Sequence, residues 1–115
     1  MSHPHQRLKA YQFALRFHRQ VISITRRLPT GFANLSDQLR RASRSICLNI
    51  AEGGSAWTKP NKCKYFRIAL ASAGECSAAL DLFEIEHTIS SSDLDSARSD
   101  LEALSALTVG LIRKH

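Results

Sequence analysis

The sequence predicts an all-α protein, folded as an up-down-up-down four-helix bundle in a single domain. Its 115 residues are enough for one domain and too few for two. Apolar residues recur three and four positions apart, whereas no segment alternates apolar and polar residues with β-branched enrichment. Four helical segments joined by short connections pack most simply with each helix antiparallel to the next.

The first two helices are expected at about residues 6–28 and 37–53. The turn at Pro29–Gly31 ends the first helix, because proline disfavours helix at the preceding residue and glycine frees the turn. Ser36 is suited to cap the second helix, since its hydroxyl accepts hydrogen bonds from the free amides of the first turn. The pair Gly53–Gly54 predicts the end of this helix, because glycine readily adopts the left-handed cap conformation.

The third and fourth helices are expected at about residues 60–87 and 93–113. Pro60 suits the first turn of a helix, where no amide hydrogen is needed. Ser92 is the predicted cap of the fourth helix, and Arg113–Lys114 lie at the negative end of its dipole. All four helices therefore have recognisable boundaries.

Each predicted helix has one core stripe of apolar residues when its residues are placed at 100° intervals. We expect these four stripes to form the core of the bundle. In chain order they are Ala10, Phe13, Phe17, Val21, Ile24 and Leu28; Leu35, Leu39, Ala42, Ile46 and Ile50; Phe66, Ala69, Ala73, Cys76, Leu80 and Phe83; and Leu94, Ala97, Leu101, Leu104 and Leu111.

The first and third helices each carry a second stripe, more than 100° from the core stripe. Diagonal helices turn these surplus faces in different directions, and two unlike faces on opposite sides predict head-to-tail contacts that close into a ring. The alternative is a monomer with ordinary exposed apolar residues. The two stripes are Leu8, Tyr11, Leu15, His18 and Ile22, and Ile68, Ala71, Glu75, Ala78, Leu82 and Ile85.

Glu75 is the one acidic residue of these stripes. A carboxylate within an apolar interface is costly unless a cation pairs with it. We therefore expect Glu75 to face Arg16, Arg19 or His18 of a neighbouring subunit.

Charge is strongly polarised along the chain, whose formal net charge is +6. Residues 1–67 contain 13 Lys and Arg against two acids, whereas residues 68–115 contain 3 against 8. This asymmetry is typical of a protein that meets a polyanion, or of subunits that pair basic with acidic surfaces.

Seven basic residues of the second and third helices form the candidate nucleic-acid surface. Arginine matches phosphate oxygens bidentately and lysine adds diffuse attraction. Trp57 and Tyr65 lie among them and have rings that can stack on bases. The alternatives are an ordinary solvated face, or a scaffold whose basic face pairs with an acidic partner protein. The seven are Arg40, Arg41, Arg44, Lys59, Lys62, Lys64 and Arg67.

Other classes of function find little support in the sequence. Glu84 and His87 have the spacing of a di-iron ligand pair, but the second pair and the bridging core glutamates are missing. No catalytic triad or phosphate loop is evident, so we expect a non-enzymatic protein without metal or cofactor. The spacing of Cys47, Cys63 and Cys76 predicts buried free thiols.

Hydropathy gives no support to a membrane protein. No apolar stretch approaches the roughly 20 residues of a membrane helix, and charged residues interrupt the first apolar positions. We therefore expect a cytoplasmic protein with no membrane partner.

The segment Leu35–Gly53 resembles the signature of a bacterial four-helix bundle family first met as reading frames inside 23S rRNA intervening sequences. Leu28–Pro29, the aromatic-basic run Lys64–Arg67 and the small-residue run Ala71–Glu75 support the resemblance. Together these matches cover about residues 8–88.

The resemblance implies an up-down bundle, a homopentameric ring and no enzymatic activity. The chain is also similar to accessory proteins of diversity-generating retroelements, which are basic pentamers that bind reverse transcriptase and nucleic acid. A protein partner of that kind is therefore a further expectation. Among the motif residues we expect Gln38 and Asn49 to form register-fixing hydrogen bonds. The residues shared with the family motif are Gln38, Arg40, Arg41, Asn49, Glu52 and Gly53.

Overall fold

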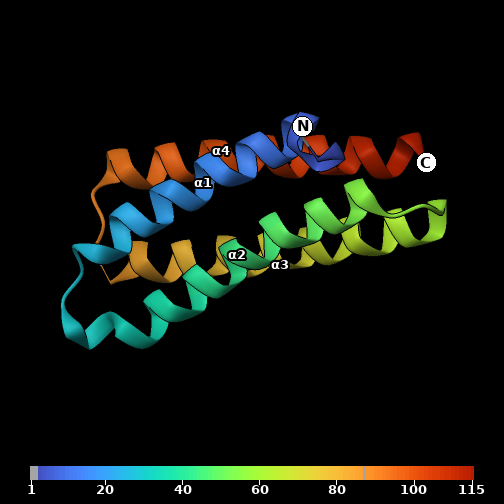
Figure 1. Cartoon of the computed structure of the whole chain (residues 1–115). Helices are drawn as coiled ribbons and strands as arrows, with labels where there is room; N and C mark the ends of the chain where they lie inside the picture. Colours follow the sequence, from blue (N-terminus) through green and yellow to red (C-terminus); the bar gives the residue numbers. More distant parts are fainter. Residues whose placement is uncertain (1–2, 87) are drawn as a thin grey trace.

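A computed structural model describes residues 3–86 and 88–115 and confirms the all-α four-helix bundle (Figure 1). A short 3-10 turn precedes the first helix and another precedes the second. In chain order the elements are η1 (Pro4–Arg7), α1 (Lys9–Arg26), η2 (Thr30–Phe32), α2 (Ala33–Ser55), α3 (Lys59–Ile85) and α4 (Ser91–Lys114).

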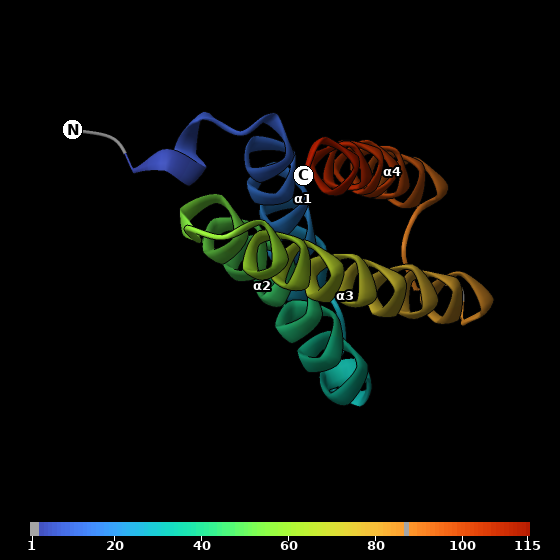
Figure 2. The same ribbon diagram turned by 90° about the vertical axis from the view of Figure 1, so that its right-hand side faces the viewer.

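Each helix packs against its neighbours in sequence, and α4 returns to pack against α1. The helices therefore alternate in direction around one core, with α1 diagonal to α3 and α2 diagonal to α4 (Figure 2). The link between α2 and α3 lies at the same end of the bundle as the C-terminal end of α4 (Figure 1). This topology is the predicted up-down-up-down arrangement.

Four predicted helix boundaries are wrong. The first helix begins at Lys9 rather than at about residue 6, because Pro4–Arg7 form the separate turn η1 and the backbone of Leu8 is extended. Ser36 does not cap α2, because the chain enters this helix at Ala33 directly from η2 and Ser36 is buried inside it. Gly53 is helical, and α2 continues to Ser55. At the start of α4 the cap is Ser90 rather than Ser92, since the Ser90 hydroxyl accepts a hydrogen bond from the Asp93 amide at 3.3 Å.

Gly53 allows the close approach of α2 and α3. A Cβ atom at this position would lie 2.5 Å from Cε1 of Phe66, a side chain that is itself buried. Gly53 is therefore required because it has no side chain, and α2 ends only at Ser55. The left-handed cap conformation predicted from the sequence is not found at Gly53, which is helical.

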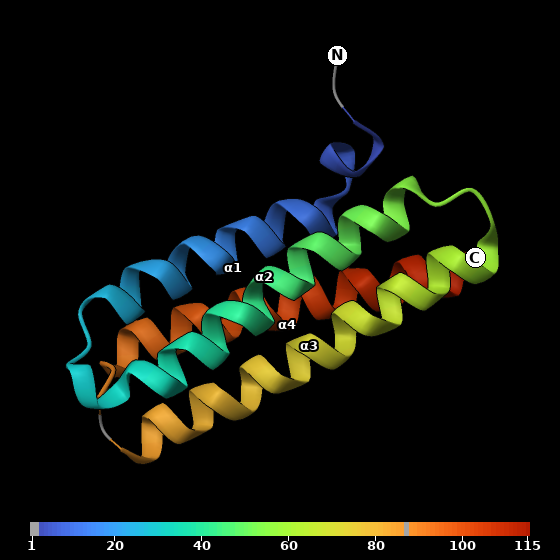
Figure 3. The ribbon, with the colours of Figure 1, turned by 60° about the horizontal axis from the view of Figure 1, so that its bottom comes forward.

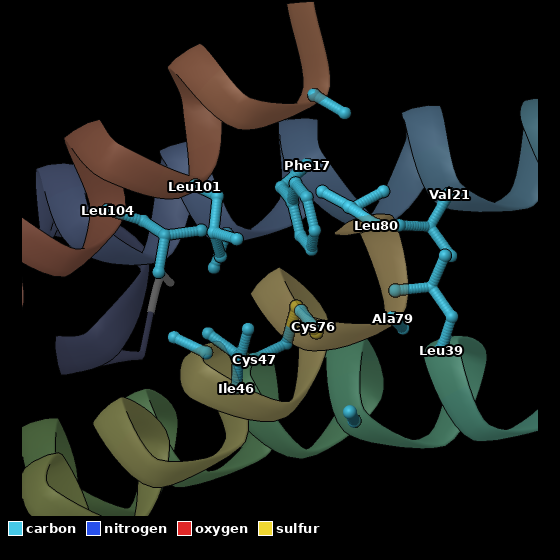
Figure 4. Close-up of a cluster of buried hydrophobic side chains, with 14 of the residues drawn as sticks. Phe17, Val21, Leu39, Ile46, Cys47, Cys76, Ala79, Leu80, Leu101 and Leu104 are labelled. Carbon is cyan, nitrogen blue, oxygen red and sulfur yellow. The ribbon is translucent and has the colours of Figure 1, made fainter. Parts of the chain in front are cut away.

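The core consists largely of the predicted stripes, and Figure 4 shows side chains from all four helices meeting in it. Ala14 and Ala79 are also buried, although neither belongs to a predicted stripe. Thr108 and Asp100 are buried polar residues of α4, which a pattern of apolar residues does not indicate. Four predicted core residues are only half-buried, near helix ends or between helices: Phe13, Leu28, Leu35 and Leu111.

Polar contacts fix how neighbouring helices sit against each other. Between α2 and α3, the hydroxyls of Ser45 and Ser72 are hydrogen-bonded at 2.8 Å. Asn49 donates to the Ser45 carbonyl at 2.9 Å and to its hydroxyl at 3.1 Å, so its hydrogen bonding is confirmed, but both bonds lie within α2 and join no second helix. Gln38 is exposed and forms no such bond within the part of the chain that the structure describes.

Candidate nucleic-acid interface and subunit surface

The predicted basic surface is free of intramolecular ion pairs. Within residues 3–86 and 88–115, the ion pairs involve only Arg16, Arg27 and Arg98. None of the seven basic residues chosen from the sequence pairs with a carboxylate there. The positive charges of those that are exposed are therefore available to an external anion.

The three arginines of α2 differ in their surroundings. Arg41 and Arg44 are exposed on the outer side of the helix. Arg40 is half-buried, and its Nε donates a hydrogen bond to the Thr25 hydroxyl of α1 at 2.7 Å. The expectation that all three project away from the bundle is therefore wrong for Arg40, because this side chain reaches into the groove between α1 and α2.

The basic residues of α3 are likewise divided. Lys59, Lys64 and Arg67 are exposed. Lys62 is half-buried, and its ammonium donates to the carbonyls of Gly53 and Gly54 at 3.2 and 3.3 Å. Lys62 thus caps the C-terminal end of α2, where unpaired carbonyls need donors.

The exposed residues lie at different levels along the bundle axis. The Ser45–Ser72 bond sets the register of α2 against α3. At a rise of 1.5 Å per residue, this register places Arg44 about 9 Å farther than Arg67 from the α2–α3 link, measured along the bundle axis. The helices α2 and α3 run side by side in opposite directions (Figure 3). Arg41 and Arg44 therefore form one group near the middle of α2, and the exposed residues of α3 form a second group nearer the α2–α3 link.

The second group belongs to a larger cluster, which we call the basic end. Antiparallel packing brings the start of α1, the end of α4 and the α2–α3 link together. Cys63 Sγ lies 3.9 Å from the Ile112 carbonyl, and a Cβ atom on Gly54 would lie 3.1 Å from Leu8. Glu52 is the one acidic residue of these segments. The basic residues are Arg7, Lys9, Lys59, Lys62, Lys64, Arg67, Arg113 and Lys114.

Carboxylates gather at the opposite end of the bundle, near the α3–α4 link. The charge asymmetry along the chain is therefore also an asymmetry along the bundle axis. Sequence reasoning missed four members of the basic end, at residues 7, 9, 113 and 114, because they are distant in sequence. The predicted topology itself would have brought them together. The acidic residues are Asp37, Asp81, Glu84, Glu86, Asp93 and Asp95.

Trp57 projects from the basic end. It lies in the link between α2 and α3 and is 98% exposed, more than any other large apolar side chain of the described residues. Tyr65 is half-buried, and the Lys64 ammonium lies 5.4 Å from its ring centroid. Of the two aromatic residues considered for stacking, only Trp57 presents a free ring.

The two surplus stripes are covered to different extents. The α3 stripe is exposed along its whole length, with Ile85 at 71% and Leu82 at 48%. The α1 stripe is half-buried, because Leu8, Tyr11 and Leu15 pack against the edge of the core. A single bundle therefore covers much of the α1 stripe and leaves the α3 stripe open.

Glu75 lies at the centre of the exposed stripe, beside a shallow groove between α2 and α3. The groove has a volume of about 200 Å³ and is lined by apolar side chains together with Gln38 and Glu75. This arrangement offers a carboxylate and an amide oxygen between apolar walls, which suits the stem and head of an arginine or lysine. The apolar lining residues are Leu35, Ala78, Ala79 and Leu82.

The predicted cationic partners of Glu75 are not equally free. Arg16 pairs with Asp100 of its own chain at 3.3 Å. His18 is half-buried, and its Nδ1 is hydrogen-bonded to the Ser43 hydroxyl at 2.8 Å. Arg19 is exposed and forms no ion pair within the described residues. Of the three candidates, Arg19 is therefore the one left available.

The environment of His18 favours its neutral form. Burial lowers the pKa of His18 below its ordinary value, and the nearby positive charge of Arg44 lowers it further. A neutral imidazole can donate to the Ser43 hydroxyl or accept from it, depending on the tautomer, so the hydrogen bond does not require a charged ring.

The cysteines behave as small core residues rather than reactive thiols. Cys47 and Cys76 are buried, and Cys63 is half-buried. Burial raises the pKa of the Cys47 thiol to about 11 and that of Cys76 to about 12, so both stay protonated near neutral pH. This confirms the predicted burial for two of the three.

Neither a metal centre nor a membrane span is found in residues 3–86 and 88–115. No three His, Cys, Asp or Glu side chains in these ranges lie together in a way that could hold a metal ion. His87, the second member of the di-iron-like pair, lies outside the described residues. No helix of the described chain has the length and apolar character needed to cross a membrane.

Comparison with known proteins agrees with the fold. A crystal structure of a protein of unknown function from the S23 ribosomal protein family of Bacteroides thetaiotaomicron superposes with a TM-score of 0.83 at 23% sequence identity. The match covers 90% of this chain and 95% of that one. No protein with a curated description matches the sequence. The family model described as 23S rRNA-intervening sequence protein matches residues 6–110, and the chain therefore belongs to this family.

Proposed function

We propose that this protein is a non-enzymatic, ring-forming bundle that binds nucleic acid, RNA in particular, through its basic side chains. The observation that supports this proposal is the absence, within the described residues, of any ion pair to the basic end or to Arg41 and Arg44. The family description, which refers to intervening sequences of 23S rRNA, adds support for RNA over DNA.

The interaction expected with nucleic acid is mainly electrostatic. Cations that neutralise phosphates release condensed counterions, so affinity should fall steeply with salt and depend weakly on sequence. Arg41 and Arg44 are suitable for a test because both are exposed, whereas replacing Arg40 would also remove its hydrogen bond to Thr25. Lys64 and Arg67 offer an independent test of the basic end.

Filter binding with a structured RNA, from low to physiological salt, tests the proposal. We expect each of the double variants Arg41→Gln/Arg44→Gln and Lys64→Gln/Arg67→Gln to weaken binding about tenfold at low salt. The log-log salt slope should become shallower by about 1 for each phosphate that is no longer neutralised. The matched control Arg27→Gln/Arg98→Gln removes the same charge from cations that already pair with carboxylates.

Three outcomes would contradict the nucleic-acid proposal. One is a wild-type protein that binds neither structured RNA nor duplex DNA at low salt. The second is an unchanged salt slope in both surface variants, and the third is an equal loss of affinity in the control variant. Any of these results would favour the alternative, a scaffold whose basic face pairs with an acidic partner protein.

For assembly, we propose that the α3 stripe packs against the α1 stripe of a second copy, and that repetition closes a ring of five. The α3 stripe is exposed, and its neighbouring groove contains Gln38 and Glu75. Arg19 of the adjoining copy would place its guanidinium on Glu75 and its stem against Leu82. Because α1 and α3 are diagonal, these contacts are head-to-tail and can propagate around a ring.

A further inference from the structure

We propose that Trp57, together with the lysines around it, forms a stacking site for an unpaired base of single-stranded nucleic acid. The inference rests on the proposed nucleic-acid function and specifies the form of the ligand. A tryptophan that is 98% exposed leaves its whole ring in water, which is unusual for the largest apolar side chain. Such a ring can stack on any base, because every base has a π face.

The backbone on both sides of Trp57 is held by hydrogen bonds. On the α2 side, the Ala56 amide donates to the Glu52 carbonyl at 2.9 Å. On the α3 side, the Thr58 hydroxyl accepts from the Asn61 amide at 3.3 Å. Lys62 ties the two helices together through the carbonyls at the end of α2. The ring is therefore presented from a fixed three-residue link, and little backbone order has to be gained on binding.

The charge around Trp57 suits a phosphate backbone. Lys59 follows it by two residues, and Lys64 and Arg67 are exposed on the next two turns of α3. Arg113 and Lys114 end α4 at the same end of the bundle. A stacked base held between such cations is the usual arrangement of sequence-tolerant single-strand binding.

A single strand fits this site better than a duplex does. A lone exposed ring at the end of a bundle reaches an unpaired base directly, whereas entering a duplex costs a few kcal/mol of unstacking. A membrane surface is a poorer match, because interfacial binding needs a continuous apolar face. The residues on either side of Trp57 in the link are only Ala56 and Thr58, and polar side chains follow.

Intrinsic fluorescence offers a direct test, since Trp57 is the only tryptophan of the chain. Full-length protein is titrated at low salt with an oligo(U) of about 20 nucleotides, and separately with a duplex of equal length. We expect oligo(U) to quench the emission and to protect Trp57 from acrylamide, with a smaller effect from the duplex. Trp57→Ala should weaken oligo(U) binding about tenfold, measured with a labelled oligonucleotide, and duplex binding less than about twofold.

Control variants separate stacking from other effects. Leu48→Ala truncates another exposed apolar residue, 59% accessible on α2, and should leave both affinities unchanged. Trp57→Phe keeps a ring and should retain most of the oligo(U) affinity. Circular dichroism and thermal melting verify that the variants fold.

The outcomes distinguish the stacking site from the broader function. Binding of oligo(U) with no change in Trp57 emission, and with equal affinity in Trp57→Ala, would overturn the stacking site while leaving nucleic-acid binding intact. A wild type that binds neither oligo(U) nor duplex would overturn both proposals. Emission changes with anionic phosphatidylserine vesicles, but not with oligo(U), would assign Trp57 to a membrane surface instead.

Discussion

At the scale of single residues, Gly53 and Phe66 set how closely α2 and α3 approach. A methyl group at Gly53 would overlap the Phe66 ring, which is fully enclosed by the core. Gly74 is also helical, but a Cβ atom there would meet nothing within 4 Å. The two glycines therefore form a matched pair in which one is required by packing and the other is not.

We expect Gly53→Ala to lower the free energy of unfolding by about 1–2 kcal/mol, because overpacking outweighs the gain in helix propensity. Gly74→Ala should instead raise it by about 0.5–1 kcal/mol, since alanine loses less backbone entropy on folding. Urea unfolding followed by circular dichroism, at equal protein concentrations, measures both. Equal effects of the two substitutions would show that the Phe66 contact is unimportant.

His18 predicts a pH dependence of stability. Its pKa is lowered in the folded state, so below about pH 6.5 the unfolded chain binds the proton more readily. The stabilisation is complete above that pH and is lost as the pH falls. We expect the urea midpoint to fall less between about pH 7.5 and 5.5 in His18→Asn than in the wild type.

An NMR titration checks the physical cause. Removing the nearby cation in Arg44→Gln should raise the pKa of His18 toward its ordinary value. An unchanged pKa would assign the whole effect to burial.

At the scale of the helices, a buried carboxylate joins α1 to α4. Asp100 is 5% exposed, accepts a hydrogen bond from the Gln20 amide, and pairs with Arg16. The Arg16 side chain is 66% exposed, so solvent screens this ion pair and the bond to Gln20 matters more.

We therefore expect Asp100→Ala to lower the free energy of unfolding by about 1–3 kcal/mol, because the Gln20 amide loses its acceptor. Asp100→Asn retains an acceptor oxygen and should cost less. Arg16→Gln should cost under about 1 kcal/mol. Thermal melting of the three variants ranks them, and a larger loss for Arg16→Gln than for Asp100→Ala would reverse this assignment.

At the scale of the whole molecule, the open α3 stripe and the free Arg19 predict an assembly. Light scattering at micromolar concentration should give the mass of a ring, whereas a monomer mass would end the proposal. Leu82→Asp and Leu15→Asp should each dissociate the ring, because each buries an unpaired charge. Leu48→Asp, on the exposed side of α2, is the control that should leave the mass unchanged.

A charge reversal tests the specific contact between copies. Glu75→Arg or Arg19→Glu alone should weaken assembly at least about tenfold, because like charges then face each other in an apolar seam. The double variant should restore the ring mass, since the pair is re-formed with opposite polarity. If the double variant does not regain the ring mass although both single variants are folded, Arg19 is not the partner of Glu75.

Periodicity in the sequence was sufficient for the bundle and for most of its core. The stripe from Phe66 to Phe83 on α3 is buried as predicted, and so is that from Ala10 to Ile24 on α1 apart from the half-buried Phe13. Asp100 was not predicted, because an acidic residue at a core position has no apolar signal. Ser36 and Gly53 match the signature of a cap but serve as interior packing residues, and only the neighbouring helix distinguishes these two uses.

The sequence by itself determined the fold class, the order of the helices and the excess of positive charge, because these depend on local periodicity and on composition. The tertiary structure decided which basic residues remain available. It turned Arg40 inward to Thr25 and Lys62 onto the end of α2, so that neither side chain is fully exposed. The physical reason is that side-chain reach and antiparallel packing act between residues far apart in the chain, where sequence spacing carries no information.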